Sequence, residues 1–174
     1  MDIEGPFPRM RRGNRFILVL SDYVTRYPEA IALRTMSASK IAEVLIDIFA
    51  RHGIPDETLT DQGTNFTSAL LGELYRLIGI KALRTSHYHP QADGLVERFY
   101  TTLKAMLRKV LKGEKRDWDY MLPHALFAYR EVPQATVGFS TFELFTDATF
   151  EDFWKCYVKG GSRRQRLKLI SSTM

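Results

Sequence analysis

The pattern of apolar and polar positions predicts short strands that alternate with amphipathic helices. Residues 15–34, "RFILVLSDYVTRYPEAIALR", contain two apolar runs, "FILVL" and "EAIAL", separated by a polar turn. This arrangement is typical of two buried strands. Two further short strands are expected, in "ETLTD", which ends at Asp61, and in "IKALRTS".

Helical spacing of apolar residues follows between these strands. Ser37 is a good N-cap for a helix that ends at Gly53, and its apolar positions are Ile41, Val44, Leu45, Ile48 and Phe49. Thr67 can cap a second helix that ends at Gly79 and carries Leu70, Leu71, Leu74, Leu77 and Ile78. A loop through "HYHPQADG" is expected to lead into a long helix over about 95–111, followed by another over 117–131.

This order of elements predicts an α/β fold with a mixed five-stranded sheet flanked by helices. The first strand, in "MDIEGP", is expected to be truncated because Asp2 is only the second residue. Residues 1–147 are interpreted as one domain. Periodicity is lost in residues 148–174, which are expected to form a basic, loosely ordered tail.

Composition narrows the class of protein. With 174 residues, 45% of them apolar, the chain can bury a substantial core, and no apolar run is long enough for a membrane span. No secretory signal is recognisable, and the single cysteine, Cys156, excludes an internal disulfide or a cysteine-rich zinc module. The net charge of +5 favours a polyanionic partner. For the basic runs at 9–15 and 163–168, solvated surface and DNA contact are equally good interpretations.

Three carboxylates are candidates for a metal site. Asp61 follows a strand, Glu97 lies near the start of the long helix after a gap of 35 residues, and Asp2 lies in the first extended segment. Carboxylate oxygens are preferred ligands of Mg²⁺, and paired ions serve phosphoryl transfer. Asp61 could equally be a turn residue, and among 20 acidic residues some triple with suitable spacing is inevitable.

The predicted long helix carries a polar stripe beside its apolar one. Its apolar stripe comprises Leu95, Phe99, Leu103, Met106, Leu107 and Val110. The polar stripe comprises Glu97, Thr101, Lys104 and Arg108. Such a stripe suits a metal ligand at one end and a phosphate backbone along the rest. An ordinary solvated face would show the same spacing.

The segments "TDQGTNF" and "YHPQADGLVERF" resemble the catalytic core of retroviral and Gypsy-type retrotransposon integrases. The family signature of two aspartates and a glutamate, the last two separated by 35 residues, matches Asp2, Asp61 and Glu97. The resemblance extends over roughly residues 1–147, through "RFILVLSDYVTRYPEA" and "FAYREVPQATVGFSTFEL".

The resemblance implies an RNase H-like fold and an Mg²⁺- or Mn²⁺-dependent polynucleotidyl transferase that processes 3′ ends and joins them to target DNA. Asp2 and Asp61 would hold one ion, and Asp2 and Glu97 the other, with no zinc site. The residues that match DNA-contacting or site-lining positions are Asn65, Tyr88, Gln91 and Lys104, and Arg108 continues the basic stripe. DNA, further copies of the chain and a nuclear location are implied, without a membrane.

The chain departs from the family pattern at several positions. Tyr100 replaces an amide near the expected metal site, and Thr141 replaces a proline. These changes keep a second interpretation open, in which the chain is a catalytically weak or inactive nucleic-acid-binding fragment. A third interpretation, an RNase H-like nuclease, shares the fold and metals but would hydrolyse the RNA of hybrids. The 35-residue gap argues against it.

Overall fold

The computed structural model describes residues 1–60, 63, 65–84, 90–110, 118–134 and 138–146. In chain order its elements are β1 (Asp2–Glu4), β2 (Phe16–Ser21), β3 (Pro28–Leu33), α1 (Ala38–His52), β4 (Glu57–Thr60), α2 (Ala69–Ile78), β5 (Lys81–Arg84), α3 (Pro90–Val110), α4 (Trp118–Glu131) and α5 (Thr141–Thr146). The expected order of strands and helices is therefore confirmed. The short α5 is an addition to it.

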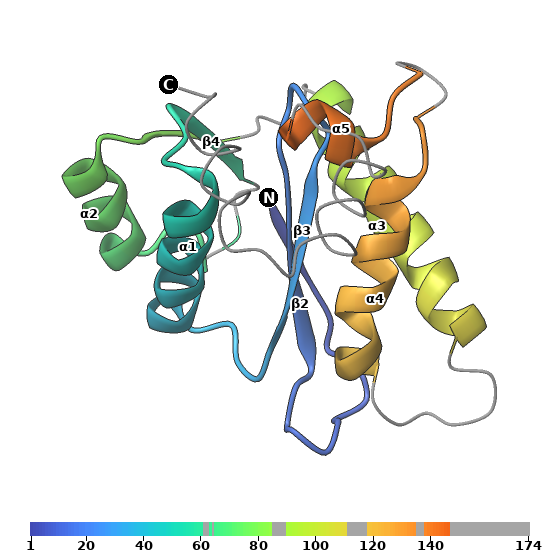
Figure 1. Ribbon diagram of the computed structural model, residues 1–174. Coiled ribbons are helices and arrows are strands. Elements are labelled where there is room, and N and C mark those ends of the chain that lie inside the picture. Colours follow the sequence, from blue (N-terminus) through green and yellow to red (C-terminus); the bar gives the residue numbers. More distant parts are fainter. Residues whose placement is uncertain (61–62, 64, 85–89, 111–117, 135–137, 147–174) are drawn as a thin grey trace, which may run out of the picture.

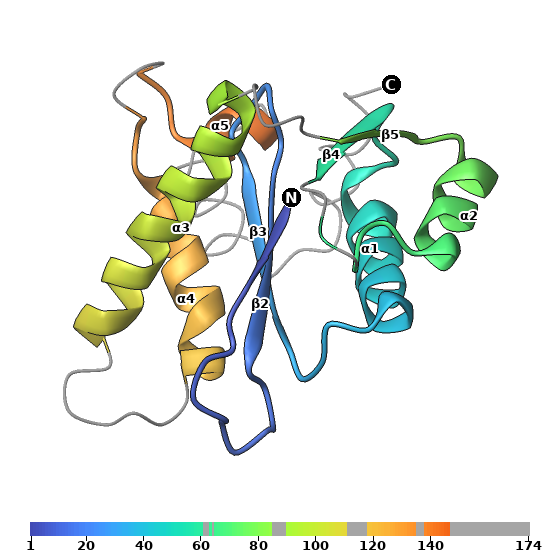
Figure 2. The ribbon, with the colours of Figure 1, turned by 180° about the vertical axis from the view of Figure 1, so that it is seen from behind.

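The strands form two ladders. β1, β2 and β3 pair in antiparallel fashion, whereas β4 and β5 pair in parallel. The ammonium nitrogen of Met1 donates to the carbonyl oxygen of Leu59 at 2.7 Å, which brings the start of β1 beside β4 (Figure 2). The five strands and the flanking helices agree with the expected mixed α/β architecture. The five strands lie in a three-stranded and a two-stranded ladder that meet at this bond.

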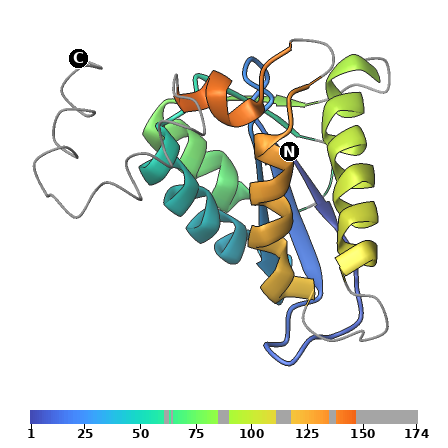
Figure 3. The same ribbon diagram turned by 45° about the vertical axis from the view of Figure 1, so that its right-hand side comes forward.

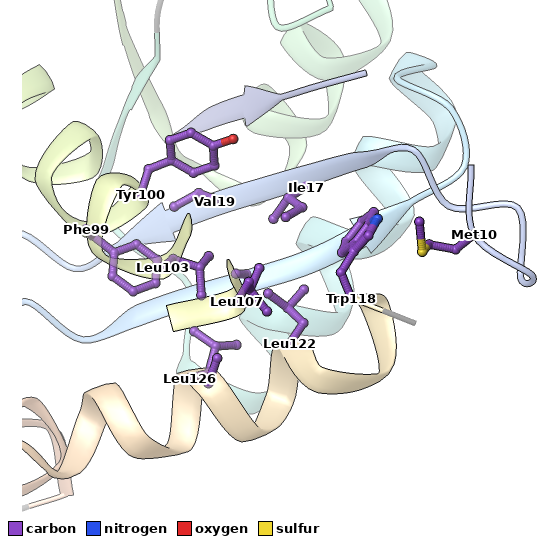
Figure 4. Close-up of a cluster of buried hydrophobic side chains, with 12 residues drawn as sticks. Met10, Ile17, Val19, Phe99, Tyr100, Leu103, Leu107, Trp118, Leu122 and Leu126 are labelled. Carbon is purple, nitrogen blue, oxygen red and sulfur yellow. The ribbon is translucent and has the colours of Figure 1, made fainter. Parts of the chain in front are cut away.

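Helices cover both faces of the three-stranded ladder (Figures 1 and 3). Ile17 and Val19 of β2 face a buried cluster with side chains of α3 and α4, which Figure 4 shows. Leu18, between them, faces a second cluster formed with α1 and α2. This alternation follows from the two-residue period of a strand, and it fixes which face each residue of β1 presents.

Local capping agrees with the sequence at α1 and differs at two other helices. Ser37 caps α1 and Gly53 ends it, as expected. The cap of α2 is Ser68 rather than Thr67, because the Ser68 hydroxyl accepts from the Leu71 amide. The helix α3 begins at Pro90 rather than near residue 95, so part of the expected loop is helical. Proline is favourable in a first helical turn, where its missing N–H is not needed.

The buried stripe of α3 is confirmed where it is described, by Phe99, Leu103 and Leu107. The described residues contain no helix that is both long and apolar enough to cross a bilayer. The expected tail at 148–174 lies outside the described residues. The proposed domain boundary near 147 therefore stays a prediction.

Candidate active site

Two carboxylates of β1 lie on the same face of the ladder. Asp2 is paired with Val19 and Glu4 with Ile17, and both partners belong to the cluster that contains α3. Ile3, between the two acids, packs instead against the cluster on the opposite face. Strand alternation therefore directs Asp2 and Glu4 toward α3. The Asp2 carboxylate also accepts a hydrogen bond from the Ile3 amide at 2.7 Å.

The facing part of α3 presents an acid, a phenol and an ammonium group. Glu97 is exposed, and Tyr100, one turn later, has only 5% of its surface exposed. The ring of Tyr100 lies beside Val19 with its hydroxyl pointing away from Phe99 (Figure 4), and hydrogen bonding between this hydroxyl and the Glu4 carboxylate contributes to the pKa shifts of both groups. The ammonium nitrogen of Lys104 lies 4.5 Å from the centre of the Tyr100 ring.

The electrostatics of this group are those of crowded acids. Burial raises the pKa of Glu4, and the negative charges of Asp2 and Glu97 raise it further. The Lys104 charge and the Tyr100 hydrogen bond act in the opposite direction on the same pKa. Burial, followed by the charge of Glu4 and the hydrogen bond to it, raises the pKa of Tyr100. Asp2, Glu4 and Glu97 therefore share one electrostatic environment, although Asp2 and Glu97 come from distant parts of the chain.

The remaining predicted site residues are only partly covered. Asp61 and Tyr88 lie outside the described residues, as does the side chain of Gln91 in the first turn of α3. Asn65 lies in the connection between β4 and α2, where its amide donates to the Met36 sulfur at 3.8 Å. Arg108 is exposed near the end of α3. The roles of all these residues stay predictions.

A divalent cation requires several ligand side chains that lie close together. Within the described residues, no three Asp, Glu, His or Cys side chains lie close enough together to hold a metal ion. Two of the three predicted ligands, Asp2 and Glu97, nevertheless face one electrostatic environment. The bond between Met1 and Leu59 also brings β4 beside the start of β1, whereas Asp61, which follows β4 in the sequence, lies outside the described residues. The all-oxygen, mutually repelling donors suit Mg²⁺ or Mn²⁺.

Glu4 is a residue of this group that the sequence interpretation missed. Its signal was available, because residues two apart in a strand share a face and Asp2 was already a candidate. The bond to Tyr100 could not be inferred from the sequence pattern, since it depends on how α3 packs on the ladder.

No family model matches the chain. Curated relatives do match it. The chain is 27% identical over 145 residues to the retrovirus-related Pol polyprotein from transposon 412 of Drosophila melanogaster, covering 83% of this chain and 12% of the relative. It is 34% identical over 141 residues to an uncharacterised protein of Caenorhabditis elegans, covering 81% and 11%. The human Gypsy retrotransposon integrase-like protein 1 is 31% identical over 129 residues, covering 74% and 24%. The chain thus spans a quarter or less of these relatives.

Solved structures agree on the fold. A chain of the simian T-cell lymphotropic virus intasome superimposes with a TM-score of 0.73 at 21% identity, covering 83% of this chain and 52% of that one. The HTLV-2 integrase catalytic core, solved with magnesium in a trimeric form, gives 0.69 at 18% identity, covering 83% and 92%. The chain is therefore homologous to Pol and integrase-like proteins of retroviruses and Gypsy-type elements, and its fold is the RNase H-like fold of retroviral integrase catalytic cores.

Proposed function

We propose that the chain is the catalytic core of a DNA integrase, a polynucleotidyl transferase that uses two divalent cations. The observation that carries this proposal is that Asp2 and Glu4 lie on the face of β1 that is turned toward α3, where the charge of Glu97 also acts on Glu4. The chain enters residue 61 directly from β4, whose Leu59 is bonded to Met1. Asp61 would complete the set of ligands, with one ion between Asp2 and Asp61 and the other between Asp2 and Glu97.

The reaction is a pair of in-line displacements at phosphorus. In end processing, a water oxygen bonds to the phosphorus of a phosphodiester while the bond to the 3′-oxygen breaks, leaving a free 3′-hydroxyl. In strand transfer, that hydroxyl bonds to a phosphorus of the target strand while the target 3′-oxygen leaves with a proton. When bound, the two ions would activate the attacking oxygen and stabilise the leaving one.

Residues of α3 supply the groups that position the DNA backbone. Lys104 is half-buried over the Tyr100 ring, so its ammonium group is kept close to the acids rather than free in solvent. It can therefore neutralise a phosphate oxygen near the reacting phosphorus. Arg108, exposed one turn further along α3, can contact the next phosphates of the same strand.

Metal-dependent resealing of a branched DNA that mimics an integration product tests this function. Purified protein is incubated with the labelled DNA and Mg²⁺ or Mn²⁺, alongside Asp61→Asn and Glu97→Gln. Loss of a single metal ligand is expected to reduce the rate by more than about 100-fold, because even outer-shell partners of ligands cost about 10–100-fold. Binding of Mn²⁺, measured by calorimetry, should weaken in both variants.

Asp47→Asn is the matched control, because Asp47 is an exposed acid on α1, and this variant should retain full rate. Equal rates for wild type, Asp61→Asn and Glu97→Gln would exclude the proposed site. DNA binding without metal-dependent chemistry in the wild type would favour a binding fragment. Cleavage confined to RNA–DNA hybrids would favour a nuclease.

Self-association and a nuclear location are part of the same proposal. Joining two DNA ends to one target requires more than one active site, and the HTLV-2 catalytic core was solved in a trimeric form. A chain that acts on chromosomal DNA would work in the nucleus of a eukaryotic cell. Sedimentation with and without branched DNA measures the first point, and microscopy of the tagged protein measures the second.

A further inference from the structure

The connection between β1 and β2, residues 5–15, is held firmly at its non-basic positions. Met10 is buried in the cluster formed with α3 and α4, and the Phe7 ring packs 5.3 Å from that of Trp118. The Asn14 amide donates to the buried Asp119 carboxylate at 2.7 Å. Backbone bonds from Gly13 to Met10 and from Phe7 to Arg15 close the turn. This segment is therefore a fixed scaffold rather than a loose loop.

The same scaffold presents its basic side chains to solvent. Five arginines are exposed there or on the adjoining end of β3, namely Arg9, Arg11, Arg12, Arg15 and Arg34. The Arg34 side chain lies against Gly13, and Arg12 lies 5.9 Å from the ring centre of the exposed Tyr120 on α4. We call these five residues the arginine surface.

The arginine surface gathers five cations that have no acidic partner among the residues that the structure describes. Within the described residues, none of its five guanidinium groups takes part in a salt bridge. Several cations on other elements are paired instead, as in Lys40 with Glu43, Arg76 with Glu73 and Lys81 with Glu57. Positive charge gathered on a rigid surface without compensation suits a polyanion, because little ordering of the loop is needed on binding.

The position of the arginine surface in the fold sets its distance from the acids. The β1–β2 connection, the start of α4 and the end of α3 lie at the same end of the molecule in all three ribbon views (Figures 1–3). From Glu97 to the end of α3 the helix rises by about 20 Å, which is the length of about six base pairs of duplex. The exposed Arg108 and Lys109 lie on this path.

We propose that the arginine surface binds the phosphate backbone of duplex DNA about six base pairs or more from the acidic site. This inference rests on the proposed function in taking DNA as the ligand, but it concerns binding rather than chemistry. It gives residues 9–15 a role in binding DNA that is separate from the roles proposed for the acidic triad and the polar stripe of α3. The contacts would set the path of the duplex without reading its sequence.

Fluorescence anisotropy with a labelled duplex in EDTA tests the surface without any reaction. The triple variant Arg9→Ala, Arg11→Ala, Arg12→Ala is compared with Lys40→Ala, Arg76→Ala, Lys81→Ala, which removes the same charge from paired positions. Three lost phosphate contacts should lower the slope of log affinity against log salt by about 2.7 in the arginine variant. The loss of affinity between about 50 and 200 mM salt then shrinks by about 40-fold. The control variant should keep the wild-type slope, and the Arg→Lys triple should restore it.

Equal slopes for the arginine and control triples would overturn the proposal, since net charge alone would then explain the effect. The length of the duplex adds a second test. On branched DNA with arms of about four base pairs the arginine variant should bind as the wild type does, whereas on arms of about sixteen it should bind more weakly. An equal deficit on both would also overturn it. If the slopes of the wild type and the arginine variant differ but the wild type shows no metal-dependent resealing, the role of the arginine surface is supported and the proposed function is rejected.

Discussion

Glu29 and Glu4 are both carboxylates held at strand positions between packed elements, but their partners are opposite in charge. Glu29 of β3 is 9% exposed, and its oxygen lies 2.7 Å from His52, 3.1 Å from Arg130 and 3.7 Å from Arg51. Glu4 of β1 has two acids, Asp2 and Glu97, among the groups that set its pKa. One acid is thus neutralised within the protein, whereas the other shares its surroundings with like charge.

The Glu29 group connects three elements, because Glu29 lies in β3 and its partners lie in α1 and α4. Arg130 also donates two hydrogen bonds to the Pro28 carbonyl and lies 4.2 Å from the Tyr27 ring centre. Phe145 of α5 stacks on the same ring. A buried carboxylate satisfied in this way has no need of an external cation, and its role is structural. Crowded acids with few internal cations are suited to a cation supplied from outside.

The largest expected difference between the two acids concerns stability, and it is tested by removing the charge of Glu29. Glu29→Gln is expected to destabilise the fold by about 3 kcal/mol, because it leaves Arg130 and His52 facing a neutral amide in a buried position. Urea denaturation measures the change. Resealing of branched DNA, assayed below the unfolding range, should be unchanged.

Glu73→Gln is the control for this prediction. The Glu73–Arg76 pair is exposed on α2, and such pairs contribute little to the free energy of unfolding. A Glu29 variant as stable as this control would show that the two acids do not differ in the way proposed. A Glu29 variant that folds well but no longer reseals branched DNA would show that Glu29 takes part in the active site.

A smaller effect is expected at Tyr100, which joins Glu4 to the apolar core. Tyr100→Phe keeps the buried ring under Lys104 but removes the hydroxyl that is hydrogen-bonded to Glu4. The loss should cost about 1.5 kcal/mol, the lower end of the range for hydrogen bonds to charged groups, since Glu4 is only partly buried. Denaturant unfolding near neutral pH measures it.

Tyr120→Phe provides the comparison. Tyr120 is 57% exposed, and loss of its hydroxyl should change the free energy of unfolding by no more than about 0.5 kcal/mol. If both tyrosine variants were equally stable, the Glu4–Tyr100 bond would make no measurable contribution to the free energy of unfolding. Glu4 would then be held by strand pairing alone.

The sequence predicted the parts of this molecule that depend on local chemistry. The spacing of Phe99, Leu103 and Leu107 specified the buried side of α3, and Ser37 and Gly53 specified the ends of α1. The start of α3 was predicted wrongly, because Pro90 and Gly94 are common in loops as well as in first helical turns.

The candidate site was predicted unevenly for a physical reason. Asp2 and Glu97 were found because a family spacing marks them, and strand alternation would have added Glu4. The Tyr100 hydroxyl could not be placed, since its partner depends on the packing of α3 against β1 and not on any local pattern. In the same way, the partners of Glu29 come from two helices, α1 and α4, that no sequence period relates to β3.

The smallest expected effect is a dependence of stability on pH that originates at Glu4. Because its pKa is raised in the folded protein, the folded state favours protonated Glu4 relative to the unfolded state. Its contribution to stability is therefore fully present below the ordinary carboxyl pKa of about 4.3 and is lost as pH rises through the folded-state pKa. Glu4→Gln keeps an oxygen that can accept from Tyr100 but removes the charge. The variant should therefore be more stable than the wild type near neutral pH, and the difference should narrow on acidification. Urea midpoints across that range measure it, with the exposed, ion-paired Glu43→Gln as control. A Glu4 variant that is less stable than the wild type at neutral pH would mean that Lys104 and Tyr100 outweigh the neighbouring acids, and the contrast with Glu29 would disappear.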